Sequence, residues 1–147
     1  MPIVEARCLL PTHAAHAFRC SQDASLRKAW DPFVRQLDGY GALGRGSRVL
    51  VRAWHGLSME VEYVAWQAPE RAAIRMVRGP RMLATFAGSW AFVECADGVD
   101  ARFRYLIKAA PLWRWCEALM CRYFAWEARR RLAAFKHYLQ SAAGEPK

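Results

Sequence analysis

The chain has 147 residues, of which 54% are hydrophobic and 24% are charged. Because so much apolar and aromatic surface can offset the entropy lost on folding, the composition excludes an intrinsically disordered protein and the collagen-like, coiled-coil and low-complexity classes. The 22 Lys and Arg residues outnumber the 13 Asp and Glu residues, and the net charge of +9 is compatible with an anionic partner but identifies none.

The sequence predicts a soluble, cytoplasmic protein. No apolar stretch approaches the roughly 18 residues that a membrane span needs. The opening residues Met-Pro-Ile-Val-Glu-Ala-Arg carry charges where a signal peptide would have an apolar segment.

The first quarter of the chain combines extended and helical patterns. Thr12 follows the first extended segment and offers a helix N-cap. Pro32 ends the second helical segment, because the residue before a proline avoids the helical region. These signals predict a strand, two short helices and a short strand, in that order, over residues 2–10, 13–20, 24–30 and 34–37.

From Ser47 onward the apolar residues recur at every second position. Met59, Val61 and Tyr63, for example, alternate with glutamates. This period of two is typical of half-buried antiparallel strands. The hairpin turns are predicted at His55-Gly56, Ala68-Pro69, Gly79-Pro80 and Asp97-Gly98.

After Pro111 the hydrophobic period becomes helical and predicts one long helix over residues 112–139, about 42 Å at 1.5 Å per residue. A helix of this length that follows six or seven strands is expected to lie across the concave face of a curved antiparallel sheet. Its apolar stripe consists of Leu112, Cys116, Leu119, Met120, Tyr123, Phe124, Ala128, Leu132, Phe135 and Leu139.

Four short sequences match local features of one superfamily. They are Leu9-Leu10-Pro11-Thr12 with His16-Ala17-Phe18 and Asp23, then Trp30-Asp31-Pro32, Gly44-Arg45-Gly46 and Trp90-Ala91-Phe92. With the order of the predicted elements, they make residues 2–140 resemble the START-like (SRPBCC) superfamily. This superfamily includes the polyketide cyclase/dehydrase-type proteins and the plant pollen-allergen proteins.

The resemblance implies an α+β helix-grip fold, in which a curved antiparallel sheet of six to seven strands wraps around a long C-terminal helix and two short helices follow the first strand. We expect residues 1–140 to form a single START-like domain and residues 141–147 to be a flexible tail. The resemblance also implies a deep, mostly apolar cavity between sheet and helix for lipids, polyketides, hormones or aromatic compounds. It implies no metal and no cofactor.

The inward face of the predicted sheet fits a plain core and the wall of such a cavity equally well. Gly88 shares this face with aromatic residues and should leave an enclosed pocket of a few hundred Å³ under the helix. Tyr63 and Tyr105 stand out, because a buried phenol needs a partner and would orient a carbonyl or hydroxyl of a ligand. The predicted ligand-binding residues are Met59, Tyr63, Ile74, Met76, Phe86, Trp90, Phe92, Phe103, Tyr105, Met120 and Phe124.

Two other motifs have simpler explanations than a cofactor or metal site. Residues 39–44 match the Gly-x-Gly-x-x-Gly pattern, but a strand follows where a dinucleotide site needs a helix. We therefore expect a hairpin turn, with a flap at the cavity mouth as its further use. His13 and His16 lie three residues apart on a predicted helix with no third ligand nearby, so we expect no metal there.

The charges of the long helix allow more than one interpretation. Glu127 lies on or beside the apolar stripe and is expected at a solvated edge, with ligand binding or pairing with an arginine as alternatives. Arg129, Arg130 and Arg131 fan over the helix surface, so at least one points away from the sheet. A solvated face is the simpler interpretation. Weak contact with an anionic membrane, aided by Arg122 and nearby tryptophans, is the alternative.

Two functions fit this sequence. The first is a carrier or sensor that encloses a hydrophobic or amphipathic small molecule. The second is a polyketide cyclase/dehydratase-type enzyme in the same cavity, whose catalytic residues the sequence does not identify. A buried acid or base with a shifted pKa among the apolar walls would favour the enzyme. Nucleic acid is disfavoured as a partner, because the arginines are spread over strands and helix.

Overall fold

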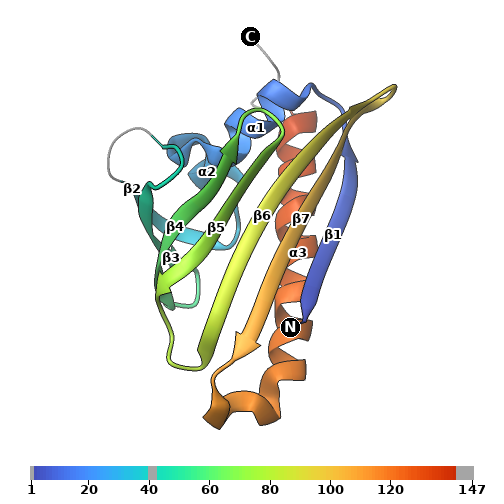
Figure 1. Ribbon diagram of the computed structural model, residues 1–147. Helices are drawn as coiled ribbons and strands as arrows, with labels where there is room; N and C mark the ends of the chain where they lie inside the picture. The colour runs from blue at the N-terminus through green and yellow to red at the C-terminus, as the bar shows by residue number, and fades with distance from the viewer. Residues whose placement is uncertain (1, 40–42, 142–147) are drawn as a thin grey trace.

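The computed structural model describes residues 2–39 and 43–141 (Figure 1). In chain order its elements are β1 (Ile3–Leu10), α1 (Ala14–Gln22), α2 (Ala24–Trp30), β2 (Val34–Gly39), β3 (Arg48–Ala53), β4 (Ser58–Gln67), β5 (Arg71–Arg78), β6 (Leu83–Cys95), β7 (Gly98–Ala109), the 3-10 helix η1 (Pro111–Cys116) and α3 (Glu117–Gln140). The order confirms the predicted strand, pair of short helices, antiparallel strands and long helix.

The seven described strands form one antiparallel sheet in the order β1-β7-β6-β5-β4-β3-β2. Strands β2 to β7 each pair with their neighbours in sequence, and β1 joins the sheet at β7, with Ile3 opposite Leu106 and Leu10 opposite Val99. Figure 1 shows the sheet curling around α3, which runs along its concave face. This arrangement is the helix-grip fold.

Aspartates set both ends of the second short helix. The Asp23 carboxylate accepts hydrogen bonds from the backbone N–H groups of Ser25 and Leu26, which would otherwise lack partners at the start of α2. Asp31 ends the helix and precedes Pro32, as predicted. The side chain of Asp31 is buried, so the end of α2 brings a carboxylate into the interior.

The long helix begins later than predicted. Residues 111–116 form η1, and the α-helix starts only at Glu117. The Glu117 carboxylate accepts a hydrogen bond of 3.0 Å from the backbone N–H of Ala109, which closes a tight corner after β7. Leu112 and Leu119, which the apolar stripe assigned to the core, are 86% and 62% exposed.

The core lies between the concave face of the sheet and α3. Phe135 on α3 is fully buried, and its ring centroid lies 4.5 Å from that of Trp30 on α2 and 5.5 Å from that of Trp90 on β6. The alternating burial along β6 and β7 confirms the predicted period of two. Aromatic rings from three elements therefore hold the long helix against the sheet.

The turn between β6 and β7 requires a glycine. Gly98 has a φ of 141°, and a Cβ at this position would lie 2.2 Å from the carbonyl oxygen of Leu10. Only a residue without a side chain lets the end of β1 come this close. The predicted Asp97-Gly98 turn is confirmed, and it lies against Leu10, the last residue of β1.

Candidate ligand-binding site

A small enclosed space, here called the inner cavity, lies between the concave face of the sheet and α3. Its volume is about 50 Å³, so the expectation of a few hundred Å³ around Gly88 is wrong. Gly88 does line the cavity, but neighbouring rings fill most of the room. The ring centroids of Trp90 and Phe103 lie 4.4 Å apart, and those of Phe86 and Tyr105 lie 5.2 Å apart.

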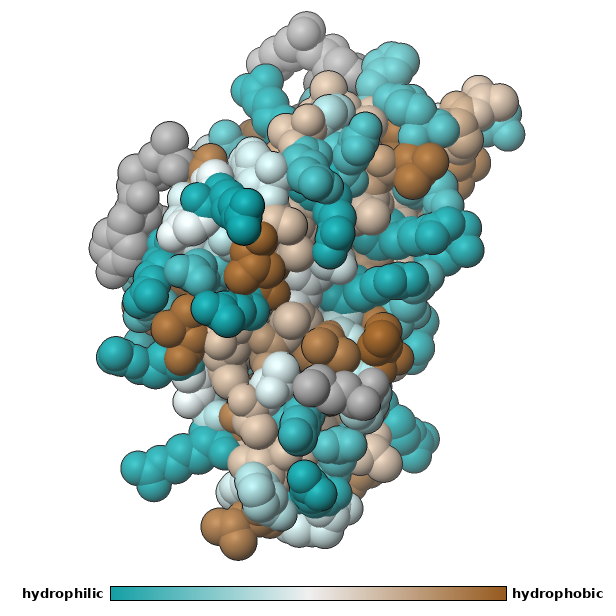
Figure 2. Space-filling model, in the orientation of Figure 1, coloured by the Kyte–Doolittle hydropathy of each residue, from teal (hydrophilic) through white to brown (hydrophobic). Residues whose placement is uncertain are grey.

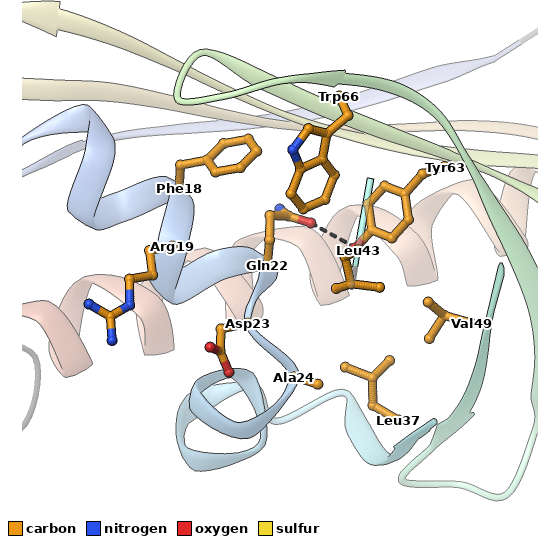
Figure 3. A pocket seen from close by; sticks show the side chains of 10 residues that line it. All are labelled: Phe18, Arg19, Gln22, Asp23, Ala24, Leu37, Leu43, Val49, Tyr63 and Trp66. Carbon is orange, nitrogen blue, oxygen red and sulfur yellow. Dashed lines mark hydrogen bonds between the residues drawn. The ribbon is translucent and has the colours of Figure 1, made fainter. Parts of the chain in front are cut away.

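A larger space, here called the outer pocket, has a volume of about 480 Å³ (Figure 3). This volume falls within the range of about 300–1,000 Å³ that is typical of ligand sites. It lies among α1, α2 and strands β2 to β4, and its walls are Phe18, Arg19, Gln22, Asp23, Ala24, Leu37, Leu43, Val49, Tyr63 and Trp66. Gln22, Leu37, Val49 and Tyr63 also line the inner cavity, so the two spaces adjoin.

A hydrogen bond between Tyr63 and Gln22 stands where the two spaces meet. The Tyr63 phenol donates to Oε1 of Gln22 at 2.8 Å (Figure 3), and Nε2 of Gln22 donates to Oγ of Ser21 at 2.9 Å. Burial raises the pKa of Tyr63, although the nearby charge of Arg27 opposes the shift. The phenol is therefore neutral at pH 7, and its proton is available for the hydrogen bond to Gln22.

Arg131, one partner of a buried ion pair, lines the inner cavity. Arg131 on α3 is 3% exposed, and its Nε and Nη2 donate to the two carboxylate oxygens of Asp31 at 3.1 and 2.7 Å. Its Nη1 donates to the phenol oxygen of Tyr105. The guanidinium carbon also lies 4.9 and 4.8 Å from the ring centroids of Phe33 and Phe103. The hydrogen bonds to Asp31 and Tyr105, together with the two nearby rings, hold this guanidinium in one orientation.

The charges of this cluster set its ionisation. Burial by itself would raise the pKa of Asp31, but the guanidinium groups of Arg131 and Arg27 hold that pKa below its usual range. Burial by itself would lower the pKa of Arg131, but Asp31 and the Tyr105 oxygen raise it. Burial also raises the pKa of Tyr105, although Arg131 opposes the shift. At neutral pH the wall therefore presents a neutral phenol and a charged guanidinium, whose partner Asp31 does not itself line the cavity.

Glu127 lies in a second buried polar cluster, and the expectation of a solvated edge is wrong. Its side chain is 0% exposed and accepts hydrogen bonds from the Trp54 indole at 3.1 Å and the Tyr123 phenol at 2.9 Å. Nε of Arg130 donates to its other oxygen at 2.8 Å. The alternative of pairing with an arginine is therefore the one that the structure shows. Burial, together with the facing Glu127 carboxylate, raises the pKa of Tyr123.

The three consecutive arginines, Arg129, Arg130 and Arg131, have different surroundings. Arg131 is buried on Asp31, Arg130 is half-buried on Glu127, and Arg129 is exposed. Arg130 also lies over the ring of Trp126, 4.7 Å from its centroid. Arg129 is the residue that points away from the sheet, as predicted. Arg130 and Arg131 are paired with carboxylates, so two of the three charges expected to contact a membrane are already used inside the protein.

The structure gathers most of the predicted site residues. Seven of them line the inner cavity: Met59, Tyr63, Ile74, Phe86, Trp90, Phe103 and Tyr105. Met120 and Phe124 instead line a groove beside η1, and Phe92 packs against Phe18 with ring centroids 6.4 Å apart. Met76 lies next to Gly79 in the turn after β5. Of the walls of the outer pocket, only Tyr63 is among the predicted ligand-binding residues.

Residues 40–42 of the Gly-x-Gly-x-x-Gly segment, and with them part of the proposed flap, lie outside the described residues. Leu43, at its described end, lines the outer pocket. β3 follows from Arg48, where a dinucleotide site would need a helix. Within residues 2–39 and 43–141 no group of His, Cys, Asp and Glu side chains is arranged to hold a metal ion.

Comparison with known families identifies the chain's relatives. The sequence profile described as "Polyketide cyclase / dehydrase and lipid transport" matches residues 1–140. The chain belongs to this family. Binding of small hydrophobic ligands is the general property that the family implies. No curated protein sequence matches the chain.

Solved structures share the fold at low sequence identity. The Thermus thermophilus protein TTHA0849 is 16% identical with a TM-score of 0.81, and the match covers 97% of this chain and 99% of that one. The Zhui aromatase/cyclase from a Streptomyces species is 12% identical with a TM-score of 0.80, covering 99% of each chain. The di-domain ARO/CYC StfQ from the steffimycin pathway is 14% identical with a TM-score of 0.80, covering 97% of this chain and 52% of that one.

Proposed function

We propose that the protein binds a hydrophobic or amphipathic small molecule, such as a lipid, a polyketide or an aromatic compound, as a carrier or sensor. The observation that carries this proposal is the mostly apolar outer pocket of about 480 Å³ that adjoins the inner cavity. Each Å² of apolar ligand surface removed from water contributes about 25 cal/mol to binding. The body of the ligand lies in the outer pocket, and one end displaces the Tyr63–Gln22 hydrogen bond to enter the inner cavity.

The polar groups of the cavity favour a ligand that carries an oxygen at this end. Tyr105 accepts a hydrogen bond from Arg131, and within the described residues its own phenol proton has no acceptor. A ligand carbonyl or hydroxyl oxygen in the inner cavity would accept that proton and satisfy the phenol. We therefore expect an amphipathic ligand with an apolar body and an oxygen-bearing end.

Native mass spectrometry of the purified protein tests the proposal directly. We expect a complex heavier than the chain that loses a small, organic-soluble molecule on denaturation. Purification under mild conditions should leave the complex intact if the ligand is buried as deeply as is usual for such sites. Protein that is free of any small molecule and that binds no lipid or aromatic compound added back to it would contradict the proposal.

Gly88→Leu should weaken the binding of anilinonaphthalene sulfonate by at least about tenfold, which corresponds to about 1.4 kcal/mol. The new side chain would occupy the inner cavity, and its Cβ meets Ile74 at 3.6 Å and the carbonyl oxygen of Arg104 at 3.7 Å, both ordinary contacts. Fluorescence titration measures the affinity. Ala87→Leu is the matched control, because it places the same leucine side chain at the next position of β6, on the opposite face of the sheet. Equal affinities of both variants and the parent would show that the ligand does not use the inner cavity.

A polyketide cyclase/dehydratase-type enzyme is the second candidate, and the Tyr105–Arg131 pair favours it. A phenol that accepts from a guanidinium can donate its proton to a ligand carbonyl during cyclisation or dehydration. We place the carrier first, because the titratable groups described in the wall of the inner cavity, Arg27, Tyr63, Tyr105 and Arg131, include no carboxylate or imidazole to accept a proton.

Tyr105→Phe separates the two candidates. For a carrier, loss of one hydrogen bond should weaken the oxygen-bearing ligand roughly three- to tenfold, as measured by calorimetry, and leave the recovered compound unchanged. For an enzyme, the parent should convert an added poly-β-keto compound to a product of different mass, and the variant should not. Unchanged ligand affinity in the variant would contradict the assigned role of the phenol.

A further inference from the structure

An exposed apolar surface, here called the apolar tip, lies at the end of the molecule where η1 joins α3. It consists of Leu112, Trp113, Trp115 and Leu119, whose side chains are 86%, 39%, 78% and 62% exposed. Figure 1 places η1 beyond the ends of the strands, and Figure 2 shows apolar surface at the same end of the molecule. Four neighbouring large apolar residues with this much exposure are unusual for a lone soluble domain.

Hydrogen bonds hold the backbone of the tip in place. The N–H of Ala110 donates to the Met82 carbonyl at 2.9 Å, and the N–H of Trp113 donates to the Ala110 carbonyl at 2.8 Å. The Glu117 carboxylate caps Ala109 at 3.0 Å. The tip is therefore a fixed corner between β7 and α3, and its exposed side chains are presented together.

An apolar groove behind the tip leads toward the ligand site. Its volume is about 290 Å³, and its walls include Trp113 and Leu119. It shares Leu57, Leu83 and Phe124 with a smaller hollow, which in turn shares walls with the inner cavity. The tip thus lies at one end of a row of neighbouring apolar hollows.

Basic side chains surround the tip. Arg114 and Arg122 lie on the same segment and Arg81 lies in the turn before β6 that packs against η1, and all three are exposed. None of the three forms an ion pair with any residue in the described part of the chain. The carboxylate on this corner, Glu117, already accepts a backbone N–H. The tip is therefore apolar at its centre and positive at its rim.

We propose that the apolar tip docks on the surface of an anionic phospholipid bilayer. Tryptophan and leucine side chains above a basic rim match the interface between acyl chains and anionic headgroups. Each cation near the surface raises the partition coefficient roughly fivefold, the equivalent of about 1 kcal/mol. No helix among the described residues is long and apolar enough to cross the bilayer, so this contact is peripheral. Docking does not depend on what occupies the ligand site.

Vesicle co-sedimentation tests the proposal. We expect the parent to bind vesicles of phosphatidylcholine with phosphatidylserine at least tenfold more tightly than vesicles of phosphatidylcholine alone. This preference should disappear at about 1 M salt, where the Debye length falls to about 3 Å. The triple variant Leu112→Ser, Trp115→Ser, Leu119→Ser should lose at least tenfold in binding to the anionic vesicles and keep the unfolding curve of the parent, because the replaced side chains are exposed.

The control variant Leu9→Ser, Val93→Ser removes two other exposed apolar side chains from β1 and β6 and should bind like the parent. Gly88→Leu should also bind vesicles like the parent, which separates docking from ligand binding. Equal binding to both kinds of vesicle, or equal binding by the parent and the triple variant, would overturn the proposal. A dimer of the parent in sedimentation velocity that is absent in the triple variant would assign the tip to a second copy of the chain instead.

Discussion

Asp31→Ala should lower the free energy of unfolding by about 3–5 kcal/mol, the usual cost of leaving one partner of a buried ion pair without the other. The Arg131 guanidinium would keep its charge at 3% exposure, and of its hydrogen bonds to the described residues the one to the Tyr105 oxygen would remain. The backbone N–H of Phe33, which donates to Asp31 at 3.0 Å, would also lose its acceptor. Chemical denaturation of the parent and the variant measures the difference.

Two further variants separate the ion pair from the general effect of losing an aspartate. Asp23→Ala, at the exposed start of the same helix, removes only an N-cap and should cost about 1 kcal/mol. The double variant Asp31→Leu, Arg131→Met removes both charges together and should recover much of the stability lost in Asp31→Ala. A loss below about 1 kcal/mol for Asp31→Ala alone would show that the ion pair is not buried in solution.

The pH dependence of this effect follows from the direction of the pKa shift. The folded protein holds the pKa of Asp31 below its usual value. The stability that the Asp31 carboxylate contributes is therefore complete above the unfolded pKa of about 3.9. It is lost as the pH falls from that value through the lower folded pKa. The stability difference between parent and Asp31→Ala should therefore be constant between pH 5 and 8 and shrink only in strong acid.

The alternation of apolar and polar residues was enough to predict the sheet. A strand with one buried face repeats every second residue, and this local rule held along β4, β6 and β7. The turn at Gly98 was predictable from the Asp-Gly pair, since its backbone conformation favours glycine. The start of α3 was not predictable in this way. The helical period of the sequence continues through residues 111–116, but these residues form the tighter 3-10 helix η1 at the corner after β7.

The buried charges were the features that sequence patterning missed. Arg131 and Glu127 lie on the buried face of α3 at helical spacing from Phe124 and Phe135, so position alone marks them as inward. Their charge argued for solvent, and their partners Asp31 and Trp54 lie far away in sequence. A charged residue at a stripe position is a signal for a buried partner, but only the fold identifies that partner.

The volume of the ligand site was the least predictable property. The inward aromatic residues were identified correctly as neighbours, but no pattern shows that Trp90 and Phe103 pack against each other and fill the space beside Gly88. The outer pocket arises where α1 and α2 cover strands β2 to β4, so its walls come from distant segments. Only the packing of helices on the sheet determines this space.

Phe135→Ala should lower the free energy of unfolding by about 3–5 kcal/mol, the usual cost of deleting a fully buried phenylalanine ring. The ring is 0% exposed and packs against three other rings. Its centroid lies 4.5 Å from that of Trp30 on α2, 5.5 Å from that of Trp90 and 6.4 Å from that of Phe92, both on β6. Its loss leaves a cavity among rings that cannot collapse independently, since they are anchored on two different elements. Chemical denaturation measures the loss, and Leu119→Ala, on the exposed side of the same helix, should stay within about 0.5 kcal/mol of the parent.

A loss below about 1 kcal/mol for Phe135→Ala would mean that the C-terminal half of α3 is not docked on the sheet. The α2 end that carries Asp31 would then lack its support, because the same ring packs on Trp30 next to it.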